Sequence, residues 1–329
     1  PNNASVRLAH AEHQIRLGEL EEATKTLLAA LELRSDKALV YTRLGEVWRL
    51  RREYKKSGEA AAKALAVNSI TKPLRVRALR TSGFAKQKQD DLDGARADFQ
   101  SALRIDPENA QLNADHGFAL ALAGKLTDAR ARLERAIRLD KKLMDAHLKF
   151  GVVLYLEEDF KGAQTEFTLV LKSDGNSIPA NRYMGYLLLQ SAKPKPAIEH
   201  FLKVAELDPK DSSSMRMVGR AEMALGKLDA AIEAFRAAIN RDPKDGFAHF
   251  DMGKAHEKKS DFESAEAAYR KAIEVEGKLT HPHLYLAELL HYINDKPDEA
   301  IPHYERYLEL GGEDEDGGIE DLVKQLKEK

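Results

Sequence analysis

Residues 212–245 read SSSMRMVGRAEMALGKLDAAIEAFRAAINRDPKD and contain two stretches with apolar residues at helical spacing. Met215 and Val218 belong to the first stretch, and Ile232 and Phe235 belong to the second. Apolar side chains that recur every third or fourth position place one apolar face on an amphipathic helix. The segment therefore predicts a helix, a turn and a second helix.

The same pattern recurs along the chain with a period of 34 residues. The glycines that mark this period are Gly83, Gly117, Gly151, Gly185, Gly219 and Gly253, and Gly45 joins them with four extra residues in its unit. A small residue follows each glycine after twelve positions, at Ser57, Ala95, Ala129, Ala163, Ala197, Ala231 and Ala265. A large residue usually follows four positions later, at Phe99, Leu133, Phe167, Phe201, Phe235 and Tyr269. Such periodicity predicts an all-α repeat architecture.

The arrangement resembles the tetratricopeptide repeat (TPR) family over nearly the whole chain. Gly219, Ala231, Phe235 and Pro243 match the small residue, alanine, aromatic residue and proline that the family carries at positions 8, 20, 24 and 32 of its repeat. The resemblance implies a right-handed superhelical solenoid of helix-turn-helix repeats, in which the first helices line a concave groove.

We count about nine repeats over residues 4–314, because degenerate units extend the pattern at both ends. The ninth unit has one extra residue, which we expect in its turn. The four-residue insertion near residues 69–73 predicts a longer loop or an extra helical turn, and a bend there. Residues 315–329 are expected to form an acidic hinge and a C-terminal capping helix that covers the last apolar face.

A glycine inside a helix costs about 1 kcal/mol relative to alanine, so the periodic glycines need a packing reason. We expect each glycine to lie opposite the alanine of the second helix, where the two backbones approach most closely. The aromatic residue is then expected to fill the space between neighbouring repeats.

Composition narrows the possible functions. The chain has 329 residues, 52 Lys+Arg against 54 Asp+Glu, and no cysteine, which excludes disulfides, thiolate metal sites and a cysteine nucleophile. No apolar run reaches the roughly 20 residues of a membrane-spanning helix. None of the nucleotide-binding, metalloprotease or hydrolase motifs occurs. We therefore expect a soluble, nonenzymatic protein without a cofactor, in the cytoplasm by preference over a bacterial periplasm; the sequence determines neither its oligomeric state nor its partner.

Eleven histidines raise the alternative of a metal site. Four of them, His281, His283, His291 and His303, gather near the end of the chain, but their spacing matches no known metal loop. His147, His249 and His283 share the fourth position of their repeats, where we expect packed or half-exposed side chains. The acidic tract at residues 313–316 lacks calcium ligands at the fifth and twelfth loop positions. No metal site is therefore predicted.

The family resemblance places binding residues at the second, fifth, ninth and twelfth positions of each repeat. The residues expected to line the groove are Phe84, Phe118, Tyr155, Tyr186, Leu189, Arg182, Arg216, Arg220, Phe250 and Lys254. Buried aromatic residues would anchor a partner, and the cations would fix carboxylates beside them. The expected partner is a protein or peptide segment with apolar anchors and acidic flanks, so the chain is expected to act as an adaptor or scaffold.

Two readings of this groove stay open. Phe84 and Phe118 are equally compatible with packing between adjacent first helices. Arginines in consecutive repeats repel one another, which favours a binding role over a structural role for them. No unit carries the Lys and Asn pair with which one subset of the family clamps the carboxylate of chaperones, so that kind of partner is not expected.

An alternative function rests on a basic patch at residues 43–88, which concentrates thirteen Lys and Arg side chains. Such a patch could bind nucleic acid or an anionic surface. Only Trp48, Tyr54 and Phe84 supply aromatic rings there, and several basic side chains are expected to face solvent. Nucleic-acid binding is therefore the less favoured reading.

Overall fold

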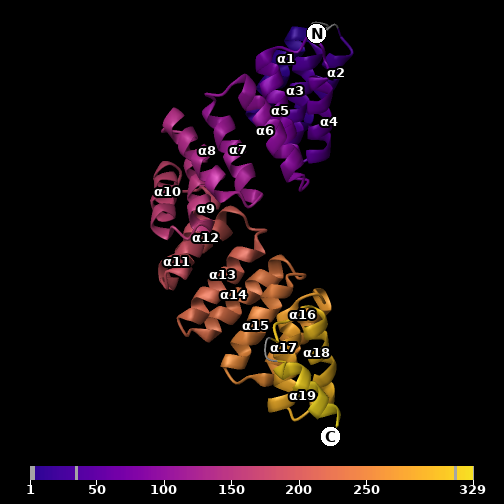
Figure 1. The fold of residues 1–329 in the computed structure, drawn as a ribbon, viewed down its shortest axis with the longest axis vertical. Coiled ribbons are helices and arrows are strands. Elements are labelled where there is room, and N and C mark those ends of the chain that lie inside the picture. The colour runs from indigo at the N-terminus through magenta and orange to yellow at the C-terminus, as the bar shows by residue number, and fades with distance from the viewer. Residues whose placement is uncertain (1–3, 34–35, 315–316, 329) are drawn as a thin grey trace. The chain divides into compact units, whose positions relative to one another are not determined.

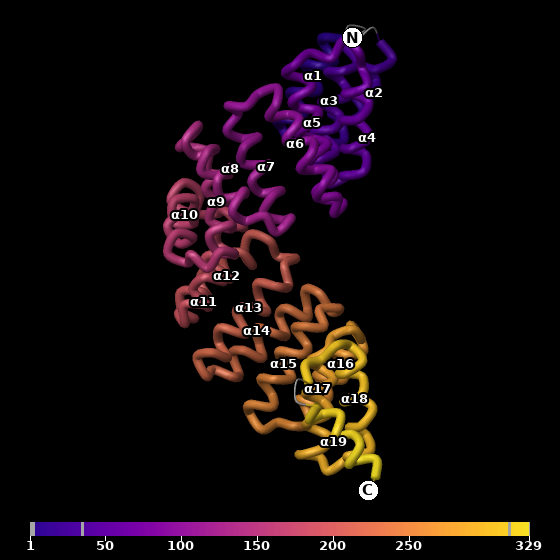
Figure 2. The backbone as a smooth tube through the Cα atoms, in the orientation of Figure 1, coloured from indigo at the N-terminus to yellow at the C-terminus, as the bar shows by residue number. Residues whose placement is uncertain are grey.

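The computed structural model describes residues 4–33, 36–314 and 317–328, and within these ranges every regular element is a helix. The chain divides into two compact units, Pro1–Ser173 and Asp174–Lys329. Consecutive helices in each unit pack as antiparallel pairs, and the trace doubles back after every helix (Figures 1 and 2). The described residues form nine such pairs, as the periodicity predicts.

The first unit contains five pairs of helices. Their bounds are α1 Ala4–Leu17, α2 Leu20–Leu31, α3 Lys37–Leu50, α4 Tyr54–Leu65, α5 Lys72–Gln87, α6 Leu92–Ile105, α7 Ala110–Leu122, α8 Leu126–Leu139, α9 Met144–Leu156 and α10 Phe160–Ser173. The second unit contains four pairs and a final helix. Their bounds are α11 Ile178–Gln190, α12 Pro194–Leu207, α13 Ser212–Ala224, α14 Leu228–Arg241, α15 Gly246–Lys258, α16 Phe262–Val275, α17 Thr280–Glu288 with the π-helix η1 Leu289–Ile293, α18 Pro297–Glu309 and α19 Gly318–Lys327.

Each periodic glycine lies inside a first helix, and its neighbour differs from the expected one. In five repeats, the atoms nearest to a Cβ added on the glycine belong to the aromatic ring sixteen residues later, in the same repeat. Gly83 faces Phe99 in this way, and the ring is fully buried. The three atoms nearest to that Cβ include a backbone oxygen of the small residue at Gly45 and Gly117. The missing side chain therefore makes room for the ring, which also packs against the next repeat, as Phe99 does with Ala119.

The four-residue insertion forms an extra helical turn. α5 begins 11 residues before its glycine, Gly83, whereas α7 begins seven residues before Gly117. Pro73 lies in the first turn of α5, where its missing N–H costs no hydrogen bond. Ile70 and Leu74 are buried against Ala38, Ala64 and Ala78, so the added turn extends the core.

The extra residue of the ninth repeat lies in the first helix, and the prediction that places it in the turn is wrong. Residues Leu289–Ile293 form a π-helical segment, and the amide of Asn294 donates to the carbonyl of Leu289 at 3.0 Å. A π turn adds one residue without ending the helix. The buried Ala287 and Ala300 therefore keep their places in the core.

The turn inside each repeat contains one residue with left-handed backbone dihedral angles. Glycine occupies this position in three repeats, with φ of 78° at Gly18 and 74° at Gly124 and Gly226. The other six repeats place a residue with a side chain there: Arg52, Asp90, Glu158, Ala192, Ser260 and Asp295. The left-handed conformation costs such residues roughly 1–2 kcal/mol, so the backbone of these six turns is locally strained.

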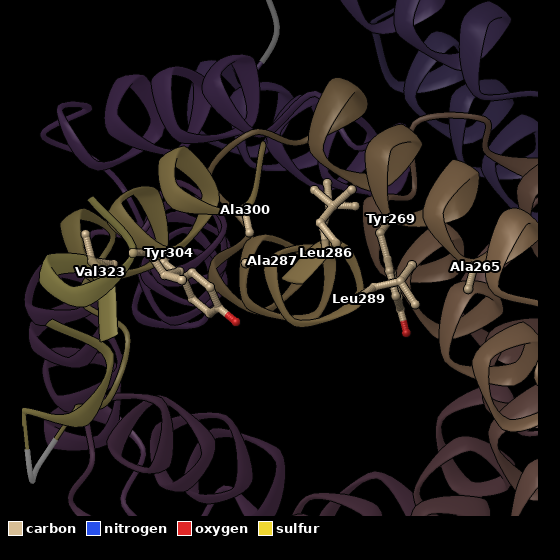
Figure 3. Close-up of a cluster of buried hydrophobic side chains, with 10 residues drawn as sticks. Ala265, Tyr269, Leu286, Ala287, Leu289, Ala300, Tyr304 and Val323 are labelled. Carbon is tan, nitrogen blue, oxygen red and sulfur yellow. The ribbon is translucent and has the colours of Figure 1, made fainter. Parts of the chain in front are cut away.

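The final helix α19 covers the end of the array as a C-terminal cap. Val323 and Leu326 of α19 are buried in one cluster with Ala300 and Tyr304 of α18 (Figure 3). The carboxylate of Asp314 accepts hydrogen bonds from the first backbone amides of α19, at 3.0 Å from Ile319 N and 3.1 Å from Glu320 N. Glu315 and Asp316 of the predicted acidic hinge lie outside the described residues.

Candidate functional site

In the first unit, residues at the predicted groove positions line a shared cavity of about 190 Å³. We name it the groove pocket, and its lining consists of Ile15, Arg43, Glu46, Arg49, Leu50, Arg77, Arg80, Thr81 and Phe84. All of these side chains belong to the first helices α1, α3 and α5. Of the predicted site residues, the groove pocket contains Phe84.

The ring of Phe84 connects the pocket to the core. It packs edge-on against Phe99 with the ring centroids 5.5 Å apart. Arg49 and Arg80 place their guanidinium groups 5.4 and 5.2 Å from the centroid of Phe84, and Lys149 places its ammonium 5.9 Å away. A ring face attracts cations, so Phe84 holds positive charge at the pocket. Phe84 thus packs against the core and also contacts the cations of the groove pocket.

Most cations of the groove pocket are already paired. Arg43 contacts Glu12 and Glu46, and Arg77 donates two hydrogen bonds to Glu46 Oε1, at 2.9 and 2.7 Å. Arg49 differs, because no described carboxylate lies within ion-pair distance of its guanidinium. Burial and the nearby Arg80 lower the pKa of Arg49 below its ordinary value. Arg49 is therefore a desolvated cation that lacks a direct counter-charge.

Arg80 is fixed by a buried aspartate of the next repeat. Asp115, whose side chain is 0% exposed, accepts from Arg80 Nε at 2.6 Å and from Lys149 Nζ at 2.5 Å. Lys149 also contacts Asp145 at 2.6 Å, and Gln111 donates to both aspartates. This network links α5, α7 and α9 beside the groove pocket.

The predicted arginines of the second unit are paired in a similar way. Arg182 contacts Asp211 at 3.1 Å, and Arg216 contacts Asp251 at 3.5 Å. Arg220 lies 3.9 Å from Asp251 and keeps 53% of its side chain exposed. A carboxylate lies beside each of these arginines and reduces the repulsion between them. Arg220 is the most accessible of the three.

The second unit also gathers aromatic rings beside a lysine. Phe250 lies 5.2 Å from Tyr285 and 5.8 Å from Tyr269, measured between ring centroids. Lys254 places its ammonium 5.5 Å from the Phe250 centroid and 5.2 Å from the Tyr285 centroid. Phe247 is 48% exposed and lies 5.3 Å from the guanidinium of Arg216. We name Phe247, Phe250, Lys254 and Tyr285 the aromatic patch.

The aromatic patch includes two residues that the sequence reasoning missed. Phe247 occupies the second position of its repeat, which is a groove position, so the register alone could have identified it. Tyr285 occupies the sixth position, which was not among the positions considered. Its contact with Lys254 depends on the packing of α15 against α17.

The remaining predicted groove residues are half-buried. Tyr155 lies 5.7 Å from Phe160, and Tyr186 lies 5.3 Å from Phe201, between ring centroids. Phe118 and Leu189 are also half-buried. These side chains share the role of Phe84, with one part in the core and one part toward the surface.

The histidines at the fourth repeat position are packed, and each finds a partner nearby. His147 contacts Glu166 at 2.6 Å and the carbonyl of Lys141 at 3.1 Å. His249 contacts the carbonyl of Pro243, and His283 contacts His303 at 3.1 Å. Among the residues that the structure describes, no group of three or more His, Asp or Glu is arranged to hold a metal ion.

Neighbouring carboxylates pair with six of the thirteen basic residues in the patch at residues 43–88. The basic residues in ion pairs are Arg43, Arg51, Lys56, Arg77, Arg80 and Lys86.

Within the described ranges, no helix is both long enough and apolar enough to span a bilayer.

Comparisons with known proteins agree with this architecture. A family profile described as tetratricopeptide repeat matches residues 8–73, 83–142 and 250–315, and one described as TPR repeat matches residues 219–260. No curated protein matches the chain. The solved structure of pilF from Pseudomonas aeruginosa is 20% identical, with a TM-score of 0.54 over 61% of this chain and 91% of that one.

Two further solved structures are similar over about half of the chain. MamA from Desulfovibrio magneticus RS-1 is 26% identical with a TM-score of 0.48, over 51% of this chain and 94% of that one. YrrB, described as a TPR protein with an unusual peptide-binding site, is 24% identical with a TM-score of 0.47, over 54% and 92%. The first family profile alone matches more than half of the residues. The chain therefore belongs to the tetratricopeptide repeat family.

Proposed function

We propose that this protein is an adaptor or scaffold that binds a peptide or protein segment along its first helices, and that it is not an enzyme. Members of the TPR family are typically non-catalytic interaction scaffolds, which supports the general role. The finer proposal is carried by one observation: the groove pocket contains Arg49, a partly buried arginine without a carboxylate partner, directly beside the face of Phe84.

The chemistry of the pocket selects a carboxylate next to an apolar group. A guanidinium forms forked hydrogen bonds to a carboxylate, and such charged hydrogen bonds contribute about 1.5–3 kcal/mol. Phe84 and Ile15 offer an apolar surface for a neighbouring side chain of the partner. The paired Glu46 repels carboxylates, so an acidic ligand must approach Arg49 from the side of Phe84 and Arg80.

The aromatic patch of the second unit offers the same combination. Phe247 exposes nearly half of its surface, and burying an apolar ring contributes about 1.5–3 kcal/mol. Lys254 and the exposed Arg220 supply positive charge near the rings. A segment with apolar anchors and acidic flanks is therefore the proposed ligand of both surfaces. The nucleic-acid alternative is not carried forward, because six of the thirteen cations in the basic patch are already in ion pairs and only three aromatic rings accompany them.

A peptide-display selection tests the proposal. The intact chain is offered a random library of twelve-residue peptides, and the affinities of selected peptides are measured by fluorescence anisotropy. We expect enrichment of acidic residues next to aromatic or aliphatic residues. For peptides that bind the first unit, Arg49→Gln should weaken binding about tenfold, which corresponds to the loss of one charged hydrogen bond.

Lys55→Gln is the matched control, because it removes one positive charge from the exposed surface of α4, outside the groove pocket. Its affinity should equal that of the wild type. Selection of peptides without acidic residues, or equal losses in both variants, would contradict the proposed site.

A further inference from the structure

A second, larger cavity lies between two second helices of the first unit, apart from the groove pocket. It has a volume of about 560 Å³, and we name it the basic cavity. Its charged lining consists of Arg96 from α6, Lys125 just before α8, and Asp128, Arg132, Arg135 and Arg138 from α8. The uncharged lining consists of Gln100 of α6, His116 and Leu120 of α7, and Ala131 of α8. An adjoining cavity of about 200 Å³ shares Arg132 and Arg135.

Positive charge in the basic cavity exceeds the negative charge available to it. Arg96 pairs with Asp93, whose side chain is 91% exposed, and Arg138 lies 3.8 Å from Glu134. No described carboxylate lies within ion-pair distance of Lys125, Arg132 or Arg135. Cations held close together around one cavity repel one another, and a bound anion would offset that repulsion.

His116 supplies an independent observation that points to a ligand. Its side chain lines the cavity although the residue is only 6% exposed, and its Nδ1 atom is buried without a hydrogen-bond partner. Burial and the neighbouring Arg132 and Arg96 lower its pKa to about 4, so the imidazole is neutral at pH 7. Buried polar atoms are nearly always hydrogen-bonded, so the unpartnered Nδ1 marks a polar group beside the cavity that the described residues do not satisfy.

The shape and lining of the basic cavity favour a compact, multiply charged ligand. The guanidinium group of arginine can donate two parallel hydrogen bonds to phosphate oxygens. Lys125, Arg132 and Arg135 together carry a charge of +3, which exceeds the charge of about −2 on one phosphate group. No Phe, Tyr or Trp lines either the basic cavity or its neighbour, so the stacking surfaces typical of single-stranded nucleic-acid sites are absent there. We propose that the basic cavity binds a small soluble anion that carries two or more phosphate groups.

Isothermal titration calorimetry of the full chain with sodium tripolyphosphate tests this proposal, with inorganic phosphate as the comparison at the same ionic strength. We expect one site, with tripolyphosphate bound at least tenfold more tightly than phosphate. Arg132→Gln with Arg135→Gln should weaken binding at least tenfold. The matched control is Arg75→Gln with Lys88→Gln, which removes two positive charges of α5 and its C-cap outside the cavity and should leave the affinity unchanged.

An NMR titration of the wild-type protein tests the same proposal if the double variant does not fold. The ring resonances of His116, assigned by comparison with His116→Gln, should shift as tripolyphosphate is added. An absent binding heat, an unmoved His116 resonance or equal losses in the control variant would overturn the proposal. Tighter binding of a twelve-nucleotide thymidine strand than of tripolyphosphate, lost in the double variant, would overturn it in favour of nucleic acid.

Discussion

The ring of Tyr269 lies so close to Gly253 that a Cβ added to the glycine would be 2.5 Å from Cε1 of the ring. The phenol hydroxyl donates to Glu257 at 2.5 Å, which holds the ring in place. Gly253→Ala should therefore lower the unfolding free energy by about 1–2 kcal/mol, because overpacking outweighs the better helix propensity of alanine. The shift of the urea unfolding midpoint measures this loss.

Gly58→Ala provides the control for that substitution. Gly58 also lies inside a helix, but its added Cβ would meet Ala85 Cβ at 3.4 Å, an ordinary contact. Here alanine should gain up to about 1 kcal/mol from helix propensity. Equal midpoint shifts in the two variants would show that ring packing does not explain the periodic glycines.

The left-handed residue of the turn offers a site for stabilisation. Ala192 has φ of 54° and no polar side chain that would ease this conformation. Ala192→Gly should raise the unfolding free energy by about 0.5–1 kcal/mol, since the relief of strain exceeds the added chain entropy of glycine. Gly124→Ala, at the equivalent turn, should lose stability by a similar amount. Thermal melting of both variants checks the opposite signs.

The buried aspartate beside the groove pocket should be important for stability. Asp115→Asn removes the charge that pairs with Arg80 and Lys149, and buried pairs broken in this way lose about 3–5 kcal/mol. We expect about 2–3 kcal/mol, because Arg80 is one-third exposed and Lys149 keeps Asp145. Glu22→Gln, which breaks an exposed pair with Lys25, should change stability by less than about 0.5 kcal/mol. Comparable losses in urea unfolding would contradict the role of burial.

Stability should fall as the solution is acidified, in part through His116. Its pKa is about 4 in the folded chain and 6.5 for an unperturbed histidine, so the unfolded chain binds more protons between these values. The neutral His116 therefore contributes to the free energy of unfolding above pH 6.5. This contribution, on the order of 2–3 kcal/mol, is lost as the pH falls from 6.5 to 4. In the variant His116→Gln, the free energy of unfolding should depend less on pH in this range, as measured by urea unfolding from pH 7 to pH 4.5. Parallel curves for the two proteins would contradict the assignment.

Removing the Phe247 ring should weaken peptide binding at the aromatic patch far more than it lowers the stability of the fold. The ring is 48% exposed, so Phe247→Ala should change stability by no more than about 0.5 kcal/mol. The same change should weaken peptides that bind the second unit about tenfold, through lost apolar burial. Leu202→Ala, at an exposed leucine of α12, is the control in the anisotropy assay. Unchanged affinity of every selected peptide in Phe247→Ala would remove the aromatic patch from the proposed site.

The repeat architecture can be predicted from the sequence because glycine, alanine and a large residue recur every 34 positions, and helix packing explains this recurrence. Gly219, Ala231 and Phe235 predict two helices and their contact, and the structure adds that the ring fills the space at the glycine. The π turn at Leu289–Ile293 could not be predicted, since one extra residue between Ala287 and Ala300 fits several local conformations.

The electrostatics of the candidate site were harder to predict. Arg80 pairs with Asp115 and Arg216 with Asp251, and both pairs are separated by 35 residues. That shared spacing is visible in the sequence, but it does not by itself show that the side chain at the sixth position of one repeat faces the side chain at the fifth position of the repeat before it. Arg132, Arg135 and Arg138 of the basic cavity share α8, whereas Arg96 comes from α6, so only the meeting of Arg96 with the other three depends on the three-dimensional fold.

The contact between Gly83 and Phe99 also bears on how such a chain can change over evolutionary time. Both residues belong to one repeat, so duplication, loss or exchange of whole 34-residue cassettes would leave every contact of this kind intact. The Arg80–Asp115 pair crosses a cassette boundary and would be broken by the same events. The contact between glycine and ring is thus complete within one cassette, whereas the ion pairs depend on which cassettes are adjacent.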